Sequence, residues 1–350
     1  HIQPNTYTVF YYNKNEWILS YKDLSYGIKP MVPYDYTSEK SVCEEIYKRL
    51  DSAVKKRVIT SDRPLACLLS GGLDSSLITS LVNKHHKGKL ETFSIGMPGS
   101  EDLKFSQIVA DHLGTKHTQI VLSEDDFFNA IPKVIYSIES YDTTTVRASV
   151  GNYLIAKYIA EHSEAKVIFN GDGSDELCGG YMYFHCAPDA QLFDQECRRL
   201  LKNIYRYDVQ RSDRSISTNG LEPRTPFLDR GWVQYYLSIP VKYRYHHGNK
   251  QCEKHLLRTA FAGNNDKVGK SYLPHDVLWR TKEAFSDGVS SKAKSWYEII
   301  DEKITEKHGD KFDTIPEEYT RMHNAPQTKE QYYYRYLFEH VPGLPEKAAE

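Results

Sequence analysis

The chain has 350 residues, of which 40% are hydrophobic and 26% are charged, a composition typical of a globular protein with about two domains. Its formal net charge of −2 gives no electrostatic reason to expect binding to nucleic acid or to a membrane surface. No run approaches the roughly 18 apolar residues of a membrane span. The six cysteines form no Cys-x-x-Cys pair, so we expect free thiols and a cytoplasmic protein.

The first residues predict a β-hairpin over 6–22, with its turn at Asn13-Lys14-Asn15. A lone hairpin is marginally stable in water, so we expect these strands to belong to a sheet whose other strands lie outside this chain. The chain begins at His1 rather than at Met, which fits a processed or shortened protein. After a linker with two prolines, a helix is expected to begin near Ser38, because apolar residues recur there at every fourth position.

Strands and helices alternate in the next part of the chain. The predicted strands cover 65–69, 90–95, 117–122 and 166–169, and the predicted helices cover 74–85, 102–113, 124–138 and 147–161. This alternation predicts an α/β fold with a doubly wound parallel sheet, whose ligands bind at the carboxyl ends of the strands. From about residue 188 the strand patterns fade, so we expect a mainly helical C-terminal part, with helices over 190–260 (interrupted), 292–307 and 329–340.

The first candidate site is the turn Ser70-Gly71-Gly72-Leu73-Asp74-Ser75, between a predicted strand and a predicted helix. Free amide groups at the start of a helix bind anions, and glycines let the backbone approach a phosphate closely. The turn lacks the lysine of a Walker A loop and the third glycine of a dinucleotide fingerprint. An aspartate beside a phosphate fits a Mg²⁺ ion between the two. The alternative is an ordinary glycine-containing turn.

The second candidate site, Asn170-Gly171-Asp172-Gly173-Ser174-Asp175-Glu176, directly follows the fourth predicted strand. Acids and glycines at a strand end can hold Mg²⁺ close to a ligand. Because Asp175 and Asp74 follow two strands of one sheet, we expect them to share metal ions that neutralise a leaving pyrophosphate. A solvated acidic turn is the alternative.

The third candidate site is Tyr141-Asp142-Thr143-Thr144-Thr145-Val146-Arg147. We expect Arg147 at a helix start, where the dipole disfavours a cation, so an anionic ligand such as a carboxylate or phosphate is a good reason for its presence. The threonine hydroxyls could bind the same anion, or they could only cap the helix.

These motifs and three later ones occur in the order found in asparagine synthetases, which belong to the ATP pyrophosphatase (PP-loop) superfamily. The later motifs are Pro226-Phe227-Leu228-Asp229, Glu253-Lys254-His255 and Trp279-Arg280-x-Lys282-Glu283-Ala284-Phe285-Ser286-Asp287-Gly288. The sequence resembles the synthetase domain of that family over about residues 40–300, and residues 332–338 are similar to its C-terminal part. The resemblance implies a ligase that joins L-aspartate and ammonia at the expense of ATP, with Mg²⁺, through β-aspartyl-AMP.

The resemblance also implies roles for individual residues. The turn residues Ser70, Gly71, Gly72, Asp74 and Ser75 would bind the pyrophosphate. Leu68 and Ile95 would contact the adenosine, and Asn170 and Gly171 would also bind ATP. Thr144 and Arg147 would act at the phosphoryl centre, Asp172 would serve adenylate formation, and Lys254, with Asp229 close by, would be a charge partner of the reacting groups. Where the family usually has Ser-Gly-Glu, this chain has Asn170-Gly171-Asp172, whose acid is one methylene shorter.

The resemblance further implies a domain division. Residues 1–37 resemble the end of an N-terminal glutaminase domain plus a linker, and 38–350 form the synthetase domain. The full-length enzyme would take its nitrogen from glutamine, and this chain would take it from ammonia. Two other readings stay open: another carboxylate-adenylating PP-loop enzyme, similar to a β-lactam synthetase, and a nucleotide-binding pseudoenzyme. The sequence is also compatible with a homodimer.

Overall fold

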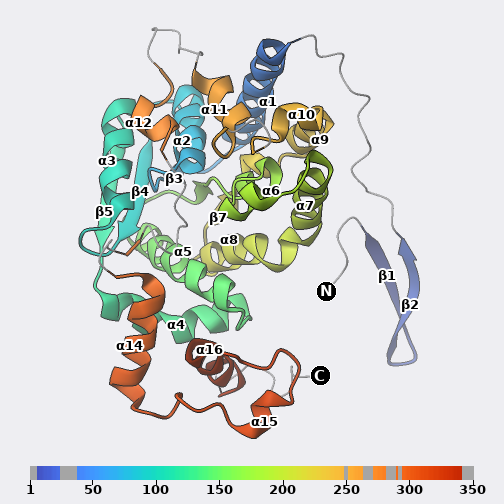
Figure 1. The fold of residues 1–350 in the computed structure, drawn as a ribbon, viewed down its shortest axis with the longest axis vertical. Coiled ribbons are helices and arrows are strands. Elements are labelled where there is room, and N and C mark those ends of the chain that lie inside the picture. Colours follow the sequence, from blue (N-terminus) through green and yellow to red (C-terminus); the bar gives the residue numbers. More distant parts are fainter. Residues whose placement is uncertain are drawn as a thin grey trace.

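The computed structural model describes residues 6–23, 38–247, 251–262, 271–280, 289–290 and 294–340. In this part of the chain, a five-stranded sheet has the order β5-β4-β3-β6-β7, and every neighbouring pair is parallel (Figure 1). The strands are β3 (Leu65–Leu68), β4 (Glu91–Gly96), β5 (Lys116–Val121), β6 (Val167–Phe169) and β7 (Glu222–Arg224). The predicted parallel α/β sheet is therefore confirmed.

Helices cover both faces of the sheet (Figure 1). The core on one face contains side chains of α1 (Glu39–Ile59), α2 (Leu73–His85), α3 (Glu101–Leu113), α6 (Ser174–Cys178), α9 (Arg230–Ser238), α11 (His255–Ala262) and α12 (His275–Leu278). The core on the other face contains side chains of α4 (Glu124–Ile138), α5 (Thr143–His162), α8 (Asp208–Ser217), α14 (Trp296–His308), α15 (Glu317–Thr320) and α16 (Lys329–His340). Of these, α14 and α16 contact α4. Two further helices, α7 (Ala190–Asn203) and α10 (Val241–Arg244), lie beside α6 and α11.

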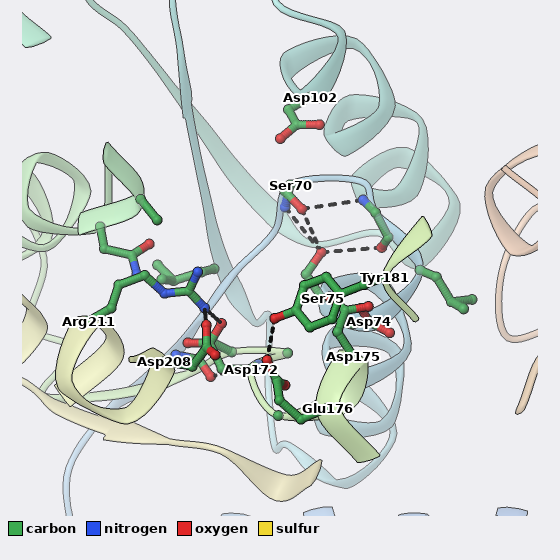
Figure 2. A pocket seen from close by; sticks show the side chains of 18 of the residues that line it. Ser70, Asp74, Ser75, Asp102, Asp172, Asp175, Glu176, Tyr181, Asp208 and Arg211 are labelled. Carbon is green, nitrogen blue, oxygen red and sulfur yellow. Dashed lines mark hydrogen bonds and ion pairs between the residues drawn. The ribbon is translucent and has the colours of Figure 1, made fainter. Parts of the chain in front are cut away.

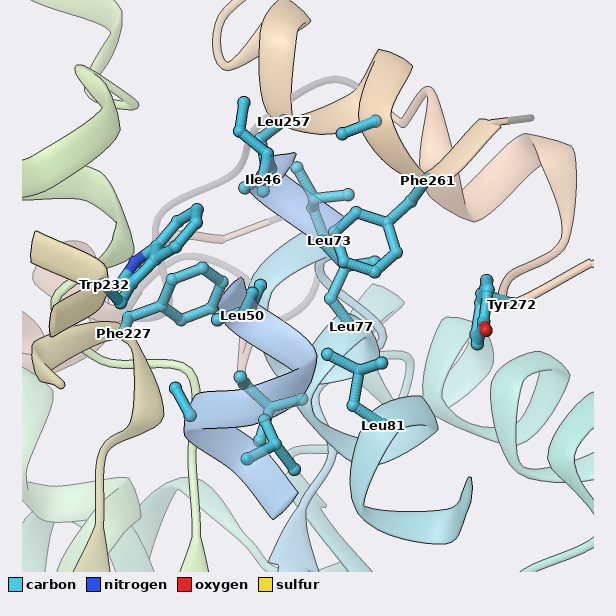
Figure 3. Close-up of a cluster of buried hydrophobic side chains, with 14 of the residues drawn as sticks. Ile46, Leu50, Leu73, Leu77, Leu81, Phe227, Trp232, Leu257, Phe261 and Tyr272 are labelled. Atoms are coloured by element: carbon cyan, nitrogen blue, oxygen red, sulfur yellow. The ribbon is translucent and has the colours of Figure 1, made fainter. Parts of the chain in front are cut away.

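Side chains of strand β3 are buried on both faces of the sheet. Successive side chains of a strand point to opposite faces. Leu65 and Cys67 are accordingly buried in the core under α1 and α2, whereas Ala66 is buried in the core under α4 and α5. Figure 3 shows the first of these cores, in which Ile46 and Leu50 of α1 meet leucines of α2 and Trp232 of α9. The apolar residues at every fourth position of α1 are thus its buried face.

The order of the strands places the site. The chain runs from β3 outwards to β4 and β5, and then returns to the opposite side of β3 to form β6. The loops that follow β3 and β6 therefore leave neighbouring strands in opposite directions. This is the switch point at which open α/β sheets bind their ligands.

Helix boundaries confirm some sequence predictions and correct others. The helix predicted to begin near Ser38 is α1, which Ser38 caps by accepting a hydrogen bond from the Ser41 amide (3.2 Å). The helix predicted to end at residue 113 is α3, which ends at Gly114 with φ 71°. The predicted start of the helix over 147–161 is wrong. Helix α5 begins at Thr143, because Asp142 accepts the Thr145 amide (2.8 Å) as its cap. Arg147 thus lies one turn inside the helix, where the dipole argument is weaker.

Strand β7 was not predicted, because the sequence beyond residue 188 was expected to be helical. It has only three residues, too few for an alternating pattern, and it contains Pro223. Proline is tolerated on an edge strand, which β7 is in this sheet. The mainly helical character of the remaining C-terminal part is confirmed.

The predicted N-terminal hairpin is confirmed as β1 (Tyr7–Asn13) and β2 (Glu16–Asp23), which form a two-stranded sheet of their own. Large side chains are exposed on it, among them Phe10 (52% exposed) and Trp17 (71%). All six cysteines are free thiols, as predicted. No helix within the described ranges is long and apolar enough to cross a membrane. The proline linker and the motif residues 282–288 lie outside the described residues.

Candidate active site

A cavity of about 520 Å³ lies at the switch point between β3 and β6. Most of the predicted site residues line it: Leu68, Ser70, Gly72, Asp74, Ser75, Ile95, Thr144, Arg147, Asn170, Gly171, Asp172, Asp175 and Lys254. Gly71 and Asp229 do not line it. Figure 2 shows acids and serines that line this cavity, together with Tyr181 and Arg211.

The loop after β3 presents hydroxyl and amide groups to the cavity. The Ser70 and Ser75 hydroxyls lie 3.0 Å apart, and the Gly72 amide donates to Ser70 Oγ (3.3 Å; Figure 2). Gly72 is the N-cap of α2 and has no side chain with which to cap it. The amide groups in the first turn of α2 are therefore left to an anionic ligand, with the helix dipole in its favour.

Two glycines set the shape of this loop. Gly71 has φ +76°, and a Cβ on it would overlap the backbone of Phe105 in α3. Gly171 brings the loop after β6 against the first loop, since a Cβ on it would lie 2.7 Å from the Ser75 nitrogen. Gly71 thus acts by packing the turn against α3 rather than by facing the cavity, and Gly171 lets the two loops touch.

Asp74 and Asp175 meet as predicted, but the cation between them in the structure is Lys254. Its Nζ lies 2.5 Å from Asp74 Oδ2 and 2.5 Å from Asp175 Oδ1. Burial alone would lower the pKa of Lys254, but the charges of Asp175 and Asp74 outweigh burial and raise it. The lysine is therefore a permanent positive charge at the base of the cavity.

No group of three or more histidine, cysteine, aspartate or glutamate side chains suited to a metal occurs within the described residues. Mg²⁺, however, is commonly bound by one or two carboxylates together with phosphate oxygens and water. The Asp74 and Asp175 oxygens come from two loops and converge on a single cation, Lys254 Nζ. This donor set fits Mg²⁺ once a phosphate-bearing ligand supplies further oxygens.

A second cluster of charged side chains is formed by Arg211 of α8 with two aspartates. The guanidinium Nη2 lies 3.1 Å from Asp172 Oδ1 and 2.7 Å from Asp208 Oδ1 (Figure 2). Burial raises the pKa of Asp172, and Arg211 offsets only part of that effect. Asp172 Oδ2 is buried and has no hydrogen-bond partner among the described residues. This oxygen can therefore accept a proton or a hydrogen bond from a ligand.

Glu176 lies beside this group and is itself buried. Burial raises the pKa of Glu176 well above its usual value, and the nearby charge of Asp208 raises it further. The hydroxyl of Tyr181 donates a hydrogen bond to Glu176 Oε1 (Figure 2). The raised pKa favours the protonated carboxyl, so Glu176 can donate as well as accept hydrogen bonds.

Arg147 lines the cavity but is held from behind by Glu330 of α16. Arg147 Nε donates to Glu330 Oε1 (2.6 Å), and its Nη2 donates to Oε2. The Arg147 guanidinium also lies 4.9 Å from the centre of the Tyr297 ring. The Glu330 side chain is fully buried, whereas 27% of the Arg147 side chain is exposed. The C-terminal helix thus fixes a cation in the cavity wall.

Asp229 has a different place from the one that the family resemblance implies. It accepts the Gly231 amide (2.9 Å) as the N-cap of α9, and it pairs with Lys56 and Arg57 of α1 (2.7 Å each). The structure does not bring it to Lys254. An aspartate directly before a helix is a capping signal, which could have indicated this role.

Replacing Asp229 with asparagine should lower stability by about 1 kcal/mol at pH 7, because the ion pairs are lost while the cap acceptor remains. Burial alone would raise the pKa of Asp229, but hydrogen bonds from Arg57 and Lys56 lower it to about 2. A depressed pKa stabilises the fold above the unfolded value of about 3.9, and this contribution is lost as the pH falls towards 2. Thermal unfolding from pH 7 to pH 2 checks this. The difference in stability between the two proteins should shrink below pH 4 and disappear near pH 2. A difference in stability that stays constant over this range would contradict the assignment.

Sequence reasoning gave no role to the residues that surround Asp172. Glu176 stood inside a quoted motif, whereas Tyr181, Asp208 and Arg211 were not singled out. The spacing of Asp208 and Arg211, three residues apart at the start of a helix, is common on solvated helix surfaces. The sequence held no signal that this pair lines a cavity, with only 18% (Arg211) and 16% (Asp208) of the side chains exposed.

The doubly wound sheet and the uncapped Ser-Gly-Gly turn at its switch point define an α/β protein with a PP-loop type of fold, whose turn is suited to an anion. The family model described as asparagine synthase matches residues 45–192 and 186–344. The chain therefore belongs to the asparagine synthase family.

Its relatives include proteins named glutamine-hydrolysing asparagine synthetase. The human protein is 46% identical over 299 residues, which are 84% of this chain and 52% of the relative. The Bos taurus protein is 45% identical over 324 residues (91% and 55%), and the Gallus gallus protein is 44% identical over 311 residues (87% and 54%). The chain thus spans about half the length of these relatives.

Proposed function

We propose that this chain carries the synthetase reaction of an asparagine synthetase: the ATP-dependent amidation of L-aspartate to L-asparagine, with release of AMP and pyrophosphate. One observation carries the proposal. A single cavity combines an uncapped anion-binding turn with an arginine, 18% of whose side chain is exposed, that pairs with two carboxylates. The first group suits a polyphosphate, and the second suits a small amino acid with charges of both signs.

The nucleotide is proposed to bind along the two glycine loops. The amides of the first turn of α2 and the hydroxyls of Ser70 and Ser75 would hold the β and γ phosphates, which leave together as pyrophosphate. Leu68 and Ile95 supply apolar lining against which the adenosine would pack. Asn170 donates to the Ser212 hydroxyl (2.7 Å), which fixes its orientation in the cavity wall next to Gly171.

Asp74 and Asp175 would hold Mg²⁺. When bound, Mg²⁺ would neutralise charge on the pyrophosphate and make it a better leaving group. The side chains of the protein supply the remaining positive charge. Arg147 would stabilise the negative charge that develops on the α-phosphate, with the Thr144 hydroxyl close by in the sequence. Lys254 would stabilise the negative charge on the oxygens of the departing pyrophosphate.

L-aspartate is proposed to bind at the group around Arg211. The guanidinium would bind a carboxylate, and the carboxylates of Asp172 and Asp208 would bind the α-ammonium group. The free carboxylate of the substrate attacks the α-phosphorus and forms β-aspartyl-AMP as the bond to pyrophosphate breaks. Ammonia then attacks the carbonyl carbon and AMP leaves. Asp172, whose pKa is raised by burial, would accept the proton that the incoming nitrogen loses.

The source of the nitrogen depends on the whole protein. We propose that residues 1–37 belong to a glutaminase domain and its linker, and that 38–350 form the synthetase domain. The exposed aromatic residues of the β1–β2 hairpin support this division, because they need a covering layer. The full-length protein would then use glutamine, and residues 38–350 would use ammonia directly. We also propose a cytoplasmic location.

The test is an assay of AMP and pyrophosphate release by this chain. Release of pyrophosphate should require ATP, Mg²⁺ and L-aspartate, and release of AMP together with formation of asparagine should require ammonia in addition. Release with another carboxylic acid in place of aspartate would instead favour a different carboxylate-adenylating enzyme. Binding of ATP without any release would favour a nucleotide-binding pseudoenzyme.

A further inference from the structure

We infer that Lys254 is the resident counter-ion of Asp74 and Asp175, and that it makes metal binding at these two carboxylates conditional on a bound polyphosphate. In this view, the protein without nucleotide does not hold a divalent cation there. The polyphosphate draws the ammonium away from the carboxylates, and the metal and the polyphosphate bind together. The inference deepens the proposed function and rests on it for the identity of the polyphosphate.

The first argument is geometric. Lys254 Nζ lies 2.5 Å from one oxygen of each carboxylate, and only 1% of the lysine side chain is exposed. The other oxygen of Asp74 accepts a hydrogen bond from the Ser174 hydroxyl (2.8 Å). A Mg²⁺ ion shared by Asp74 and Asp175 would need oxygens at about 2.1 Å, in the space between them that the ammonium fills. The lysine and the metal therefore compete for one position.

The second argument is that the chain builds a place for this lysine. Lys254 has φ +56°, a left-handed conformation that costs a lysine energy and is seen where the surroundings enforce it. Its carbonyl oxygen accepts the Arg258 amide (3.0 Å) at the start of α11, which fixes the backbone. A Cβ on Gly180 would overlap both Lys254 Cε and Asp175 Oδ1. The backbone conformation of Lys254, the hydrogen bond from Arg258 and the space at Gly180 thus together direct the lysine side chain to the two carboxylates.

The third argument concerns charge. Two carboxylates and one ammonium carry a net charge of −1, so most of the attraction for a further cation is already satisfied. A metal that entered beside the ammonium would face a like charge at short range. A polyphosphate changes this balance, because it offers oxygens to the ammonium and to the metal at once. The two ligands are then coupled, and each must strengthen the binding of the other by the same factor.

The test measures metal binding rather than turnover, with Mn²⁺ as a spectroscopic substitute for Mg²⁺. Electron paramagnetic resonance titration of the phosphate-free protein should find at least about tenfold weaker Mn²⁺ binding for the wild type than for Lys254→Met, a coupling within the usual range. The added binding should disappear in Asp74→Asn/Lys254→Met. Lys56→Met is a matched control, because Lys56 pairs with Asp229 outside the cavity (2.7 Å). This control should bind Mn²⁺ like the wild type.

Two results would overturn the inference. One is equal binding of Mn²⁺ by the wild type and Lys254→Met. The other is a tight Mn²⁺ site in the phosphate-free wild type that Asp74→Asn abolishes, a measurement that remains decisive if Lys254→Met fails to fold. The outcome is separate from the proposed function, since a protein that forms no AMP could still show this pattern of metal binding, and an active enzyme could lack it.

Discussion

Replacing Arg147 with methionine should lower the free energy of unfolding by about 3–5 kcal/mol, because the carboxylate of Glu330 is then buried without its partner. The Glu330 side chain is fully buried and accepts two hydrogen bonds from this guanidinium. AMP formation should fall by at least about 100-fold if Arg147 stabilises the α-phosphate in the transition state. A loss of activity alone would not separate these two effects. Denaturant unfolding and the AMP assay must therefore be measured together.

The double variant Arg147→Met/Glu330→Gln separates them. Without the buried charge, most of the lost stability should return, since neutralising both partners is far less costly than removing one. AMP formation should stay low, because the cation is still missing. Arg335→Met is the control. Arg335 is a buried arginine of α16, the helix that carries Glu330; it pairs with Glu339 (2.8 Å) and does not line the cavity. It should lose stability while the folded protein retains its activity. Recovered AMP formation in the double variant would mean that Arg147 only anchors α16.

The parts of the site that the sequence predicted are those whose chemistry is local. Ser70 to Ser75 form an anion-binding turn because of residues within that turn, and the strand before it is apolar. The loop after β6 is similar, with Asp175 at the start of a short helix. That the two loops lie side by side follows from the order of a doubly wound sheet. Local patterns and one topological rule were thus sufficient to bring Asp74 and Asp175 together.

The remaining parts depend on contacts between distant segments. Lys254 reaches Asp74 across 180 positions of the chain, through space that Gly180 leaves open. Arg211 meets Asp172 across 39 positions, and its helix looks like a solvated one. The family resemblance indicated that Lys254 is important, but it did not predict that the lysine takes the position expected for a metal. It also implied a role in the site for Asp229, which in the structure caps α9.

Replacing Gly71 with alanine should cost more than about 3 kcal/mol of folding free energy, whereas Gly114→Ala should cost only about 1–2 kcal/mol. The two glycines have nearly the same positive φ, +76° and +71°. Both variants therefore pay the left-handed penalty of an L-residue. A Cβ at Gly114 meets nothing within 4 Å, but at Gly71 it overlaps the backbone of Phe105, which cannot turn aside as a side chain would. Overpacking of this kind adds about 1–3 kcal/mol.

The same pair of variants tests how the loop binds its ligand. To relieve the overlap, the loop of Gly71→Ala must move away from α3, and the Ser70 and Ser75 hydroxyls, now 3.0 Å apart, would move with it. The KM for ATP should rise at least about tenfold, since the donors of an anion site act only when they are held in place. Gly114→Ala should keep the KM of the wild type. If both variants lose the same stability and keep the same KM, the packing of Gly71 against α3 does not shape the turn.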